Sequence, residues 1–544
     1  MARGLANCKR GGMNAKIDTD VVIVGAGFSG LYMLHSVRGL GLNARVIEAA
    51  DDVGGTWYWN RYPGARCDVP SMEYSYGWDD DLQQEWEWTE RYATQPEILS
   101  YMEHVTQRFD LRKDITFKTR VTASCFDEST DTWAVTTDAD EQIRCHFVVM
   151  ATGCLSSMNL PEFAGRDDFA GRSFHTGQWP HEAVDFSGRR VVVIGTGSSA
   201  IQSIPHIASE ASHVTVMQRT PNYTIPANNQ PLDPSEVAEI KADYRTWRAK
   251  ARDSTAAFGG HRPRVDVSAK ATSDEERLER FEERWALGGL GFGGAFNDLM
   301  LDPESNALAA DFFRSKVAEI VDDPELSAKL SPNTIFGCKR MCVDTDYLAT
   351  YNRPNVSLVD VSETPIERIT ASGVMTDGVE HEADDIVYAT GFDAMTGTIE
   401  RIDIAGRGGL SLRDKWSAGP LTYLGLGVEG FPNLFLITGP GSPSVLTNMI
   451  ASIEQHVEWI RDLIGSMTDQ GLSTVEADGE AEAKWVDHVN AVAGLTLFND
   501  CSSWYLGANV PGKPRVFMPL IGFPDYKAKC DEVAATGYDG WVLE

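Results

Sequence analysis

Short apolar runs that end in glycine divide the chain into predicted strands, each followed by a predicted helix. The run VVIV at residues 21–24 predicts a buried parallel strand, and VVVI at residues 191–194 predicts another. Each run passes directly into a glycine-rich turn, where a helix is expected to start. The repeated pattern predicts an α/β fold with two Rossmann-like dinucleotide-binding domains.

The first turn, VVIVGAGFSG, places Gly25, Gly27 and Gly30 on the GxGxxG frame. Such glycines allow a tight turn and a close approach of the backbone to a pyrophosphate, which the helix N-terminus stabilises. Glu48 ends the next apolar run, about 20 residues further on, where a carboxylate can accept hydrogen bonds from a ribose. We therefore predict that the first domain binds FAD.

The second turn, VVVIGTGSSA, is followed by an apolar strand that leads to an arginine instead of an acid. A cation at this position can bind the 2′-phosphate of NADPH, although an arginine exposed to solvent is the alternative. The residues expected to contact NADPH in this domain are Gly195, Gly197, Ser198, Ser199, Arg219 and Thr220.

Two similar strand ends, VVMATG at residues 148–153 and IVYATG at residues 386–391, bracket the second domain. We interpret the second domain as an insertion into the first, interrupted in turn by an acidic tract with helical periodicity. The predicted divisions are a disordered N-terminus (1–18), the FAD domain (19–155 and 388–544), the NADP domain (156–231 and 331–387) and a helical insertion (232–330).

The composition restricts the possible partners. A formal net charge of -31 argues against nucleic acid or an anionic membrane surface as a partner. The chain has no apolar run long enough to span a membrane and no secretory signal, so a cytoplasmic protein is expected. The nine cysteines show no metal-binding or redox spacing, so we expect no metal site.

Two further frames carry a family resemblance. FAGRSFHTGQWP contains Phe169, Gly171, His175, Trp179 and Pro180, and it stands just before the second glycine turn. Together with GGTWYWNRYPGARCD at residues 54–68, it resembles the fingerprints of type I Baeyer-Villiger monooxygenases. The segments GPGSPSVLTN at 439–448 and WYLGANVPGKPRVF at 504–517 extend the resemblance, which is closest to the phenylacetone and steroid monooxygenase branch.

The resemblance implies an FAD enzyme that uses NADPH and O2 to convert ketones into esters or lactones. In that family, O2 adds to carbon C4a of the reduced flavin, and the resulting peroxyflavin attacks the ketone to form a Criegee intermediate. The small residues of the 439–448 loop suggest a bulky, aromatic or cyclic ketone, with sulfoxidation as a side activity. A monomer is expected.

The same resemblance assigns roles to single residues. Arg340 matches the active-site arginine and Asp68 the carboxylate that orients it, while Lys339 matches a position near the 2′-phosphate of NADPH. Trp504 matches a residue on the nicotinamide side. The remaining expected contacts are Gly55, Thr56, Trp57 and Asp68 to the flavin and Ser444, Val445, Leu446 and Met449 to the substrate.

Each role has a structural alternative. Arg340 could form a salt bridge on the domain wall, Asp68 could cap a turn, Lys339 could be solvated, and Trp504 could be a core indole. His175 is assigned to the coupling of domain rotation with cofactor movement, and a purely structural role is equally compatible with the sequence. The alternative functions are a flavin N- or S-oxygenase, which Trp179 and Pro180 disfavour, and a dinucleotide-binding sensor without turnover.

Overall fold

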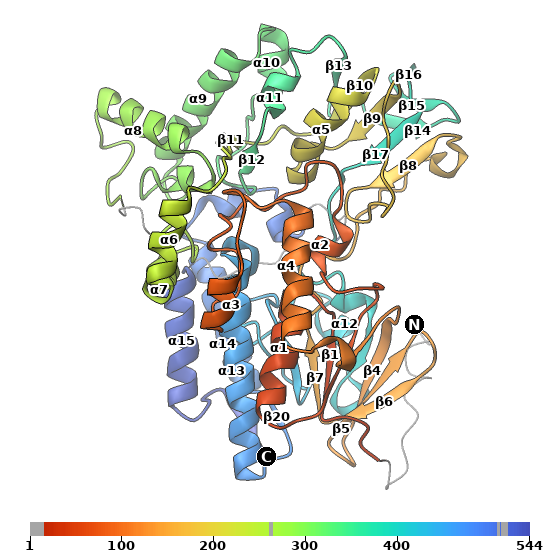
Figure 1. The fold of residues 1–544 in the computed structure, drawn as a ribbon, viewed down its shortest axis with the longest axis vertical. Coiled ribbons are helices and arrows are strands. Elements are labelled where there is room, and N and C mark those ends of the chain that lie inside the picture. The colour runs from red at the N-terminus through yellow and green to blue at the C-terminus, as the bar shows by residue number, and fades with distance from the viewer. Residues whose placement is uncertain (1–15, 261–264, 509–511, 513–520) are drawn as a thin grey trace.

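The computed structural model describes residues 16–260, 265–508, 512 and 521–544, and the predicted disordered segment 1–18 lies outside them up to residue 15. Within these residues, two five-stranded parallel sheets lie in the lower and upper halves of Figure 1. The lower sheet has the order Leu434–Leu436 (β19), Phe147–Met150 (β7), Val21–Val24 (β1), Ala44–Ile47 (β2) and Ile115–Thr116 (β3). The upper sheet has the order Val356–Asp360 (β13), His213–Gln218 (β10), Arg190–Ile194 (β9), Asp385–Tyr388 (β17) and Arg172–His175 (β8). The predicted α/β fold with two Rossmann-like domains is confirmed.

The chain leaves the lower sheet and later returns to it. β19 comes after all strands of the upper sheet, yet it pairs in parallel with β7, with Leu434 opposite Val148. The last upper strand, β17, ends at Tyr388, one residue after the boundary predicted at 387. The upper sheet is therefore built from a segment that interrupts the lower one.

Smaller sheets and helices complete the two halves. An antiparallel sheet with one parallel edge strand contains Asp403–Ala405 (β18), Val121–Asp127 (β4), Thr132–Thr137 (β5) and Gln142–Cys145 (β6). Shorter sheets are formed by Ile366–Ile369 (β14), Gly373–Thr376 (β15) and Val379–Glu382 (β16), by Thr224–Pro226 (β11) and Cys342–Asp344 (β12), and by Val475–Ala477 (β20) and Trp541–Leu543 (β21). The helices are Phe28–Gly39 (α1), Thr56–Trp59 (α2), Asp80–Glu85 (α3), Gln95–Arg108 (α4), Ser198–Glu210 (α5), Pro234–Ala242 (α6), Tyr244–Arg252 (α7), Asp274–Leu287 (α8), Pro303–Ile320 (α9), Pro324–Leu330 (α10), Tyr347–Thr350 (α11), Leu412–Lys415 (α12), Met449–Gln470 (α13), Gly479–Ala493 (α14) and Phe523–Ala535 (α15).

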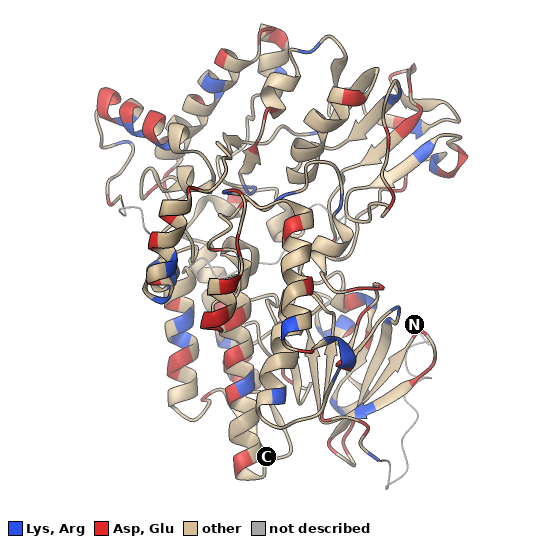
Figure 2. Cartoon of the chain, viewed as in Figure 1, with Lys and Arg blue, Asp and Glu red and all other residues tan. Residues whose placement is uncertain are grey.

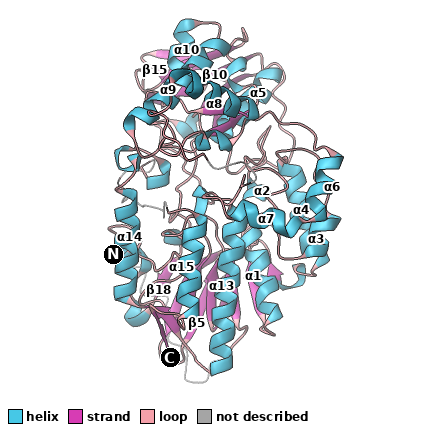
Figure 3. Ribbon diagram, turned by 90° about the vertical axis from the view of Figure 1, so that its left-hand side faces the viewer, coloured by secondary structure: helices cyan, strands magenta, loops and turns pink. Residues whose placement is uncertain are grey.

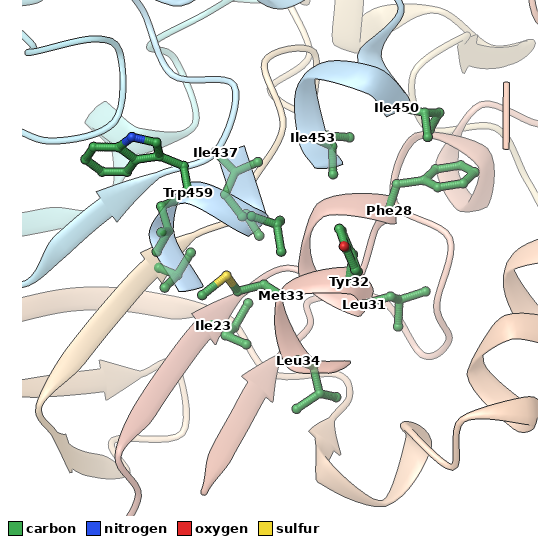
Figure 4. Packing of buried hydrophobic residues seen from close by; sticks show 14 of the residues in the cluster. Ile23, Phe28, Leu31, Tyr32, Met33, Leu34, Ile437, Ile450, Ile453 and Trp459 are labelled. Atoms are coloured by element: carbon green, nitrogen blue, oxygen red, sulfur yellow. The ribbon is translucent and has the colours of Figure 1, made fainter. Parts of the chain in front are cut away.

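The core of the lower half lies between its sheet and the helices α1 and α13. Both helices stand in front of this sheet in Figure 3, and α15 lies beside α13 and contacts it. Figure 4 shows Ile23 of β1, Met33 of α1 and Ile453 of α13 among the buried side chains of this cluster. α1 is apolar around most of its circumference, which is typical of a helix covered on more than one side. This packing fixes the N-terminus of α1 at the first glycine turn.

The helical insertion divides between the two halves of the molecule. Tyr244 and Trp247 of α7 pack against the core of the lower half, whereas Phe281 of α8 and Phe313 of α9 are buried in the core of the upper half. Figure 2 shows residues of both charges along α8, and of these only Arg284 is buried. Within the described ranges, none of the helices has the length and apolar character needed to span a bilayer.

A fully buried histidine of α13 joins three segments of the lower half. His456 accepts a hydrogen bond at Nδ1 from the backbone N–H of Thr438 (2.9 Å), so its proton is on Nε2. Nε2 donates to the Tyr526 hydroxyl (2.9 Å), which in turn donates to the Leu424 carbonyl (2.6 Å). Burial lowers the pKa of His456 to about 3, and the ring is therefore neutral in the folded protein.

The buried His456 predicts a loss of stability in acid. The pKa in the folded state lies below the ordinary value of 6.5, so the unfolded chain binds the extra proton and gains stability as the pH falls from 6.5 towards 3. We expect this group to lower the free energy of unfolding by about 1.4 kcal/mol per pH unit in that range. Unfolding of the His456→Gln variant, followed at several pH values, should show a shallower acid dependence than the parent protein. Equal slopes in the two proteins would contradict this account.

Candidate active site

The backbone of the first glycine turn packs closely against two other segments of the chain, at Ala151 and at Gly55. Gly25 has a φ of +105°, and a Cβ there would lie 2.7 Å from the Ala151 carbonyl oxygen. A Cβ at Gly55 would lie 2.9 Å from the Cα of Gly27. Only glycine fits both positions, and the N-terminus of α1 beyond the turn carries no side-chain cap. Its free backbone amides suit a pyrophosphate.

Glu48 lies at the same turn, directly after β2. Its carboxylate accepts hydrogen bonds from the backbone N–H groups of Ala26 (2.6 Å) and Ala50 (2.7 Å), and burial raises its pKa. Thr56 and Trp57 begin α2 next to Gly55; Thr56 is exposed, and the Trp57 indole donates to the Tyr74 hydroxyl (3.2 Å). The structure thus brings together the glycines and the acid predicted to hold FAD, and this arrangement fits an adenine dinucleotide.

The second glycine turn repeats this construction in the upper half. Gly195 has a φ of +111°, and a Cβ there would lie 2.4 Å from the Ala389 carbonyl oxygen. The Thr196 hydroxyl donates to the carbonyl of Thr220 (2.9 Å), so the segment that follows β10 is fixed to the turn. α5 starts at this turn, after Gly197, and has no side-chain cap. A second dinucleotide fits here for the same physical reason as the first.

Two predicted cations lie close together near this second turn. Burial lowers the pKa of Lys339, and the charge of Arg219 lowers it further. Neither residue forms an ion pair with a carboxylate in the part of the chain that the structure describes. An anionic group bound between them would relieve their repulsion, and a 2′-phosphate has the required charge.

Arg340 and Asp68 form a bidentate ion pair across the two halves of the molecule. Arg340 Nε donates to Asp68 Oδ2 (2.7 Å) and Nη2 donates to Oδ1 (2.9 Å). Both side chains are mostly buried, at 19% and 24% exposure. Burial acts to lower the pKa of Arg340, but Asp68 and Tyr505 outweigh it and raise the pKa, so the guanidinium stays charged.

A turn with a left-handed residue supplies the acceptor of the third hydrogen bond of this arginine. Arg340 Nη1 donates to the carbonyl of Val445 (2.9 Å). Ser444, just before it, is fully buried and has a φ of +45°, a left-handed conformation that non-glycine residues seldom adopt. Its hydroxyl donates to the carbonyl of Thr438 (3.4 Å) and helps to hold this conformation. The predicted substrate loop therefore positions Arg340 directly.

The other residues predicted for the pocket gather in one apolar cluster. Val445, Leu446, Met449 and Trp504 pack there with Tyr505, whose ring centroid lies 4.3 Å from that of Trp504. Tyr505 was not among the residues expected from the sequence, where its one signal is its position beside Trp504. Residues 509–511 and 513–517 of the family segment that follows lie outside the described residues.

A disulfide in this cluster was also missed. It joins Cys338 and Cys501, whose Cα atoms are 5.6 Å apart. The segments that carry Arg340 and Trp504 are thereby connected, although they are far apart in the sequence. The spacing of the cysteines along the chain gave no signal for this pair.

The fingerprint residues lie in the upper half, and one of them contacts α2. His175 Nδ1 accepts from the backbone N–H of Gly177 (3.0 Å), and Nε2 lies 3.3 Å from the Thr390 hydroxyl. The backbone N–H of Trp179 donates to the carbonyl of Trp59 in α2 (3.1 Å). Gly171 and Phe169 pack together beside β17, and Pro180 follows Trp179. Among the described residues, His175 forms no hydrogen bond with Arg340 or Asp68, so its contacts do not place it beside this ion pair.

Comparisons with known proteins agree with this geometry. The family model described as flavin-binding monooxygenase-like matches residues 18–229. A Baeyer-Villiger monooxygenase from Pseudooceanicola batsensis is 43% identical over 97% of this chain and 96% of its own length. The chain belongs to the Baeyer-Villiger monooxygenases. The resemblance inferred from the two frames is thus confirmed.

Two further relatives refine this placement. The solved structure of an oxidised steroid monooxygenase bound to NADP is 49% identical, with a TM-score of 0.92, and covers 96% of this chain and 99% of its own. It agrees with the branch that the 439–448 loop indicated. A phenazine N-monooxygenase from Lysobacter antibioticus is 41% identical over 97% of this chain and 98% of its own length. Sequence identity alone therefore does not separate carbonyl oxygenation from N-oxygenation.

Proposed function

We propose that this protein uses NADPH and O2 to convert ketones into esters or lactones, with FAD as its resident cofactor. The observation that carries the proposal is the charged guanidinium of Arg340, which Asp68 and the Val445 carbonyl fix beside an apolar cluster. The relatives named as Baeyer-Villiger and steroid monooxygenases support the same reaction class.

The two glycine turns hold the two cofactors in this proposal. Gly25, Gly27, Gly30 and Glu48 would hold FAD at the N-terminus of α1, and Gly195, Gly197, Arg219 and Lys339 would hold NADPH at the N-terminus of α5. When bound and reduced, FAD supplies the activation of O2 that no amino-acid side chain can provide.

Arg340 supplies electrostatic stabilisation in this reaction. Its charge is permanent, and it can donate to the carbonyl oxygen of a ketone as negative charge develops there. Asp68 fixes the plane of the guanidinium, so little reorganisation is needed when that charge forms. Both side chains are largely shielded from water, which strengthens the electrostatic interaction of Arg340 with a developing negative charge.

The proposed substrate class is inferred from the 439–448 loop. Gly441, Ser442 and Ser444 are small residues in the turn before Val445, and they would leave room for a bulky, aromatic or cyclic ketone. Sulfides are expected as secondary substrates. A monomeric state and a cytoplasmic location stay predictions from the sequence.

A panel of substrates tests the proposal. NADPH consumption is measured with aromatic, cyclic and short-chain ketones, with a sulfide and with an aromatic amine, and the products are identified by mass spectrometry. We expect ester or lactone formation and the highest turnover with a bulky or cyclic ketone. Turnover of the amine alone, to an N-oxide, would favour the chemistry named for the phenazine relative. Failure to oxidise any substrate would favour a dinucleotide-binding sensor.

A further inference from the structure

The loop that carries Asp68 lies directly on α5 of the upper half. Gly64 in this loop has a φ of +79°, and a Cβ there would lie 2.4 Å from the His206 ring and 2.5 Å from the Gln202 carbonyl oxygen. No other residue fits between the loop and the helix without moving one of them. The backbone of the loop therefore lies directly against the backbone of α5 at Gln202.

Gln202 of α5 binds this loop on both sides of Gly64. Its Oε1 accepts a hydrogen bond from the Tyr62 hydroxyl (2.8 Å), and its Nε2 donates to the carbonyl of Arg66 (3.1 Å). Burial raises the pKa of Tyr62, and the charge of Asp68 raises it further, so the hydroxyl remains a donor. One side chain thus fixes both ends of the turn that leads to Asp68.

The same helix also contacts the strand that follows Arg340. The Ser198 hydroxyl, one turn before Gln202, lies 3.3 Å from the Sγ of Cys342. Cys342 begins β12, two residues after Arg340. Because residues four apart lie on one face of a helix, Ser198 and Gln202 contact the two segments that carry Arg340 and Asp68 from a common surface. α5 is therefore a shared support for Asp68 and Arg340.

We propose that Gln202 is a positioning residue, which sets the Asp68 carboxylate against Arg340 by anchoring the 62–68 loop on α5. The helix starts at the second glycine turn, so the nucleotide site and the ion pair share one rigid element. Among the residues that the structure describes, no hydrogen bond joins the Gln202 side chain to Asp68 or Arg340. The inference rests on the proposed function only for its activity measurement.

Hydrogen exchange tests the anchoring without turnover. The amide N–H of Ala65 donates to the carbonyl of Tyr62 within the loop, and that of Cys67 donates to the carbonyl of Ala93 outside it. Replacement of Gln202 by Leu keeps the size of the side chain but removes both hydrogen bonds. We expect amide exchange in this loop to accelerate by about 10-fold in the FAD-bound protein. Tyr62→Phe, which removes one of the two bonds, should give a smaller acceleration.

A matched control separates this effect from a general weakening of α5. Ser209 is exposed on the same helix, and its hydroxyl donates to the carbonyl of His206. Ser209→Ala should leave exchange in the loop unchanged. Unchanged exchange in Gln202→Leu, or equal acceleration in Ser209→Ala, would overturn the proposal.

A double-mutant cycle then tests whether the loop acts through Asp68. We expect Gln202→Leu to lower the yield of oxygenated product per NADPH by about 10-fold, and to have no further effect in a protein that already carries Asp68→Ala. Additive losses, or a normal yield despite faster exchange, would overturn the positioning role. The parent protein provides the separate test of the proposed function, because its own turnover of ketone does not depend on the outcome for Gln202.

Discussion

Replacement of Arg340 by alanine is expected to lower product formation by about 10²–10³-fold, the usual cost of removing a fixed donor from a developing negative charge. Reduction of the flavin by NADPH should persist, because Arg340 bonds to Asp68 and Val445 and to none of the residues predicted to hold NADPH among those that the structure describes. The reducing equivalents should then appear as hydrogen peroxide. The measurement is the ratio of ester to NADPH consumed, alongside the rate of flavin reduction without O2.

Two variants make this prediction specific. Arg340→Lys keeps the charge but cannot form the bidentate pair with Asp68, so we expect it to recover little activity. Arg245→Ala removes an arginine that is 83% exposed and pairs with Asp80 on the surface, and it should behave as the parent protein does. A normal ester yield from Arg340→Ala would refute the assigned role.

Replacement of Arg219 by alanine is expected to raise the KM for NADPH by about 10- to 100-fold, the loss of one hydrogen bond to a charged group. The KM for NADH, which lacks the 2′-phosphate, should change little. This difference follows from the position of Arg219 beside Lys339 near the second glycine turn. Initial rates with both nucleotides at a fixed ketone concentration provide the measurement.

Lys339→Ala is the companion variant, and it should impair NADPH use in the same direction. An exposed cation elsewhere on the surface, such as Arg245, provides the control for a change in net charge. Equal increases in the KM for NADPH and NADH would show that Arg219 does not bind the 2′-phosphate.

The fold was predictable where the signal is local. A buried strand followed by GxGxxG specifies its own turn, because Gly25 and Gly195 adopt positive φ angles and touch the carbonyls of Ala151 and Ala389. Glu48 and Arg219 follow from the fixed length of a strand–helix–strand unit. The ion pair between Arg340 and Asp68 could be predicted only from the family resemblance, because no local sequence pattern indicates that residues from different halves of the molecule are in contact.

Features that depend on tertiary packing were not predictable. The carbonyl of Val445 reaches Arg340 only because Ser444 is held in a left-handed conformation, which its own sequence does not favour. The periodicity of the helical insertion indicated amphipathic helices, but an apolar face does not specify what covers it. The packing of α7 on one core and α8 on the other is therefore a result of the folded structure.

The most direct test of the central claim is a labelling experiment with ¹⁸O₂. The FAD-bound protein is supplied with NADPH, a cyclic ketone and ¹⁸O₂, and the product is analysed by mass spectrometry in the parent protein and in Arg340→Ala. The account predicts a lactone that contains one ¹⁸O atom from the parent protein, and hydrogen peroxide with almost no lactone from the variant. Unlabelled lactone, or equal labelled yields from both proteins, would contradict it.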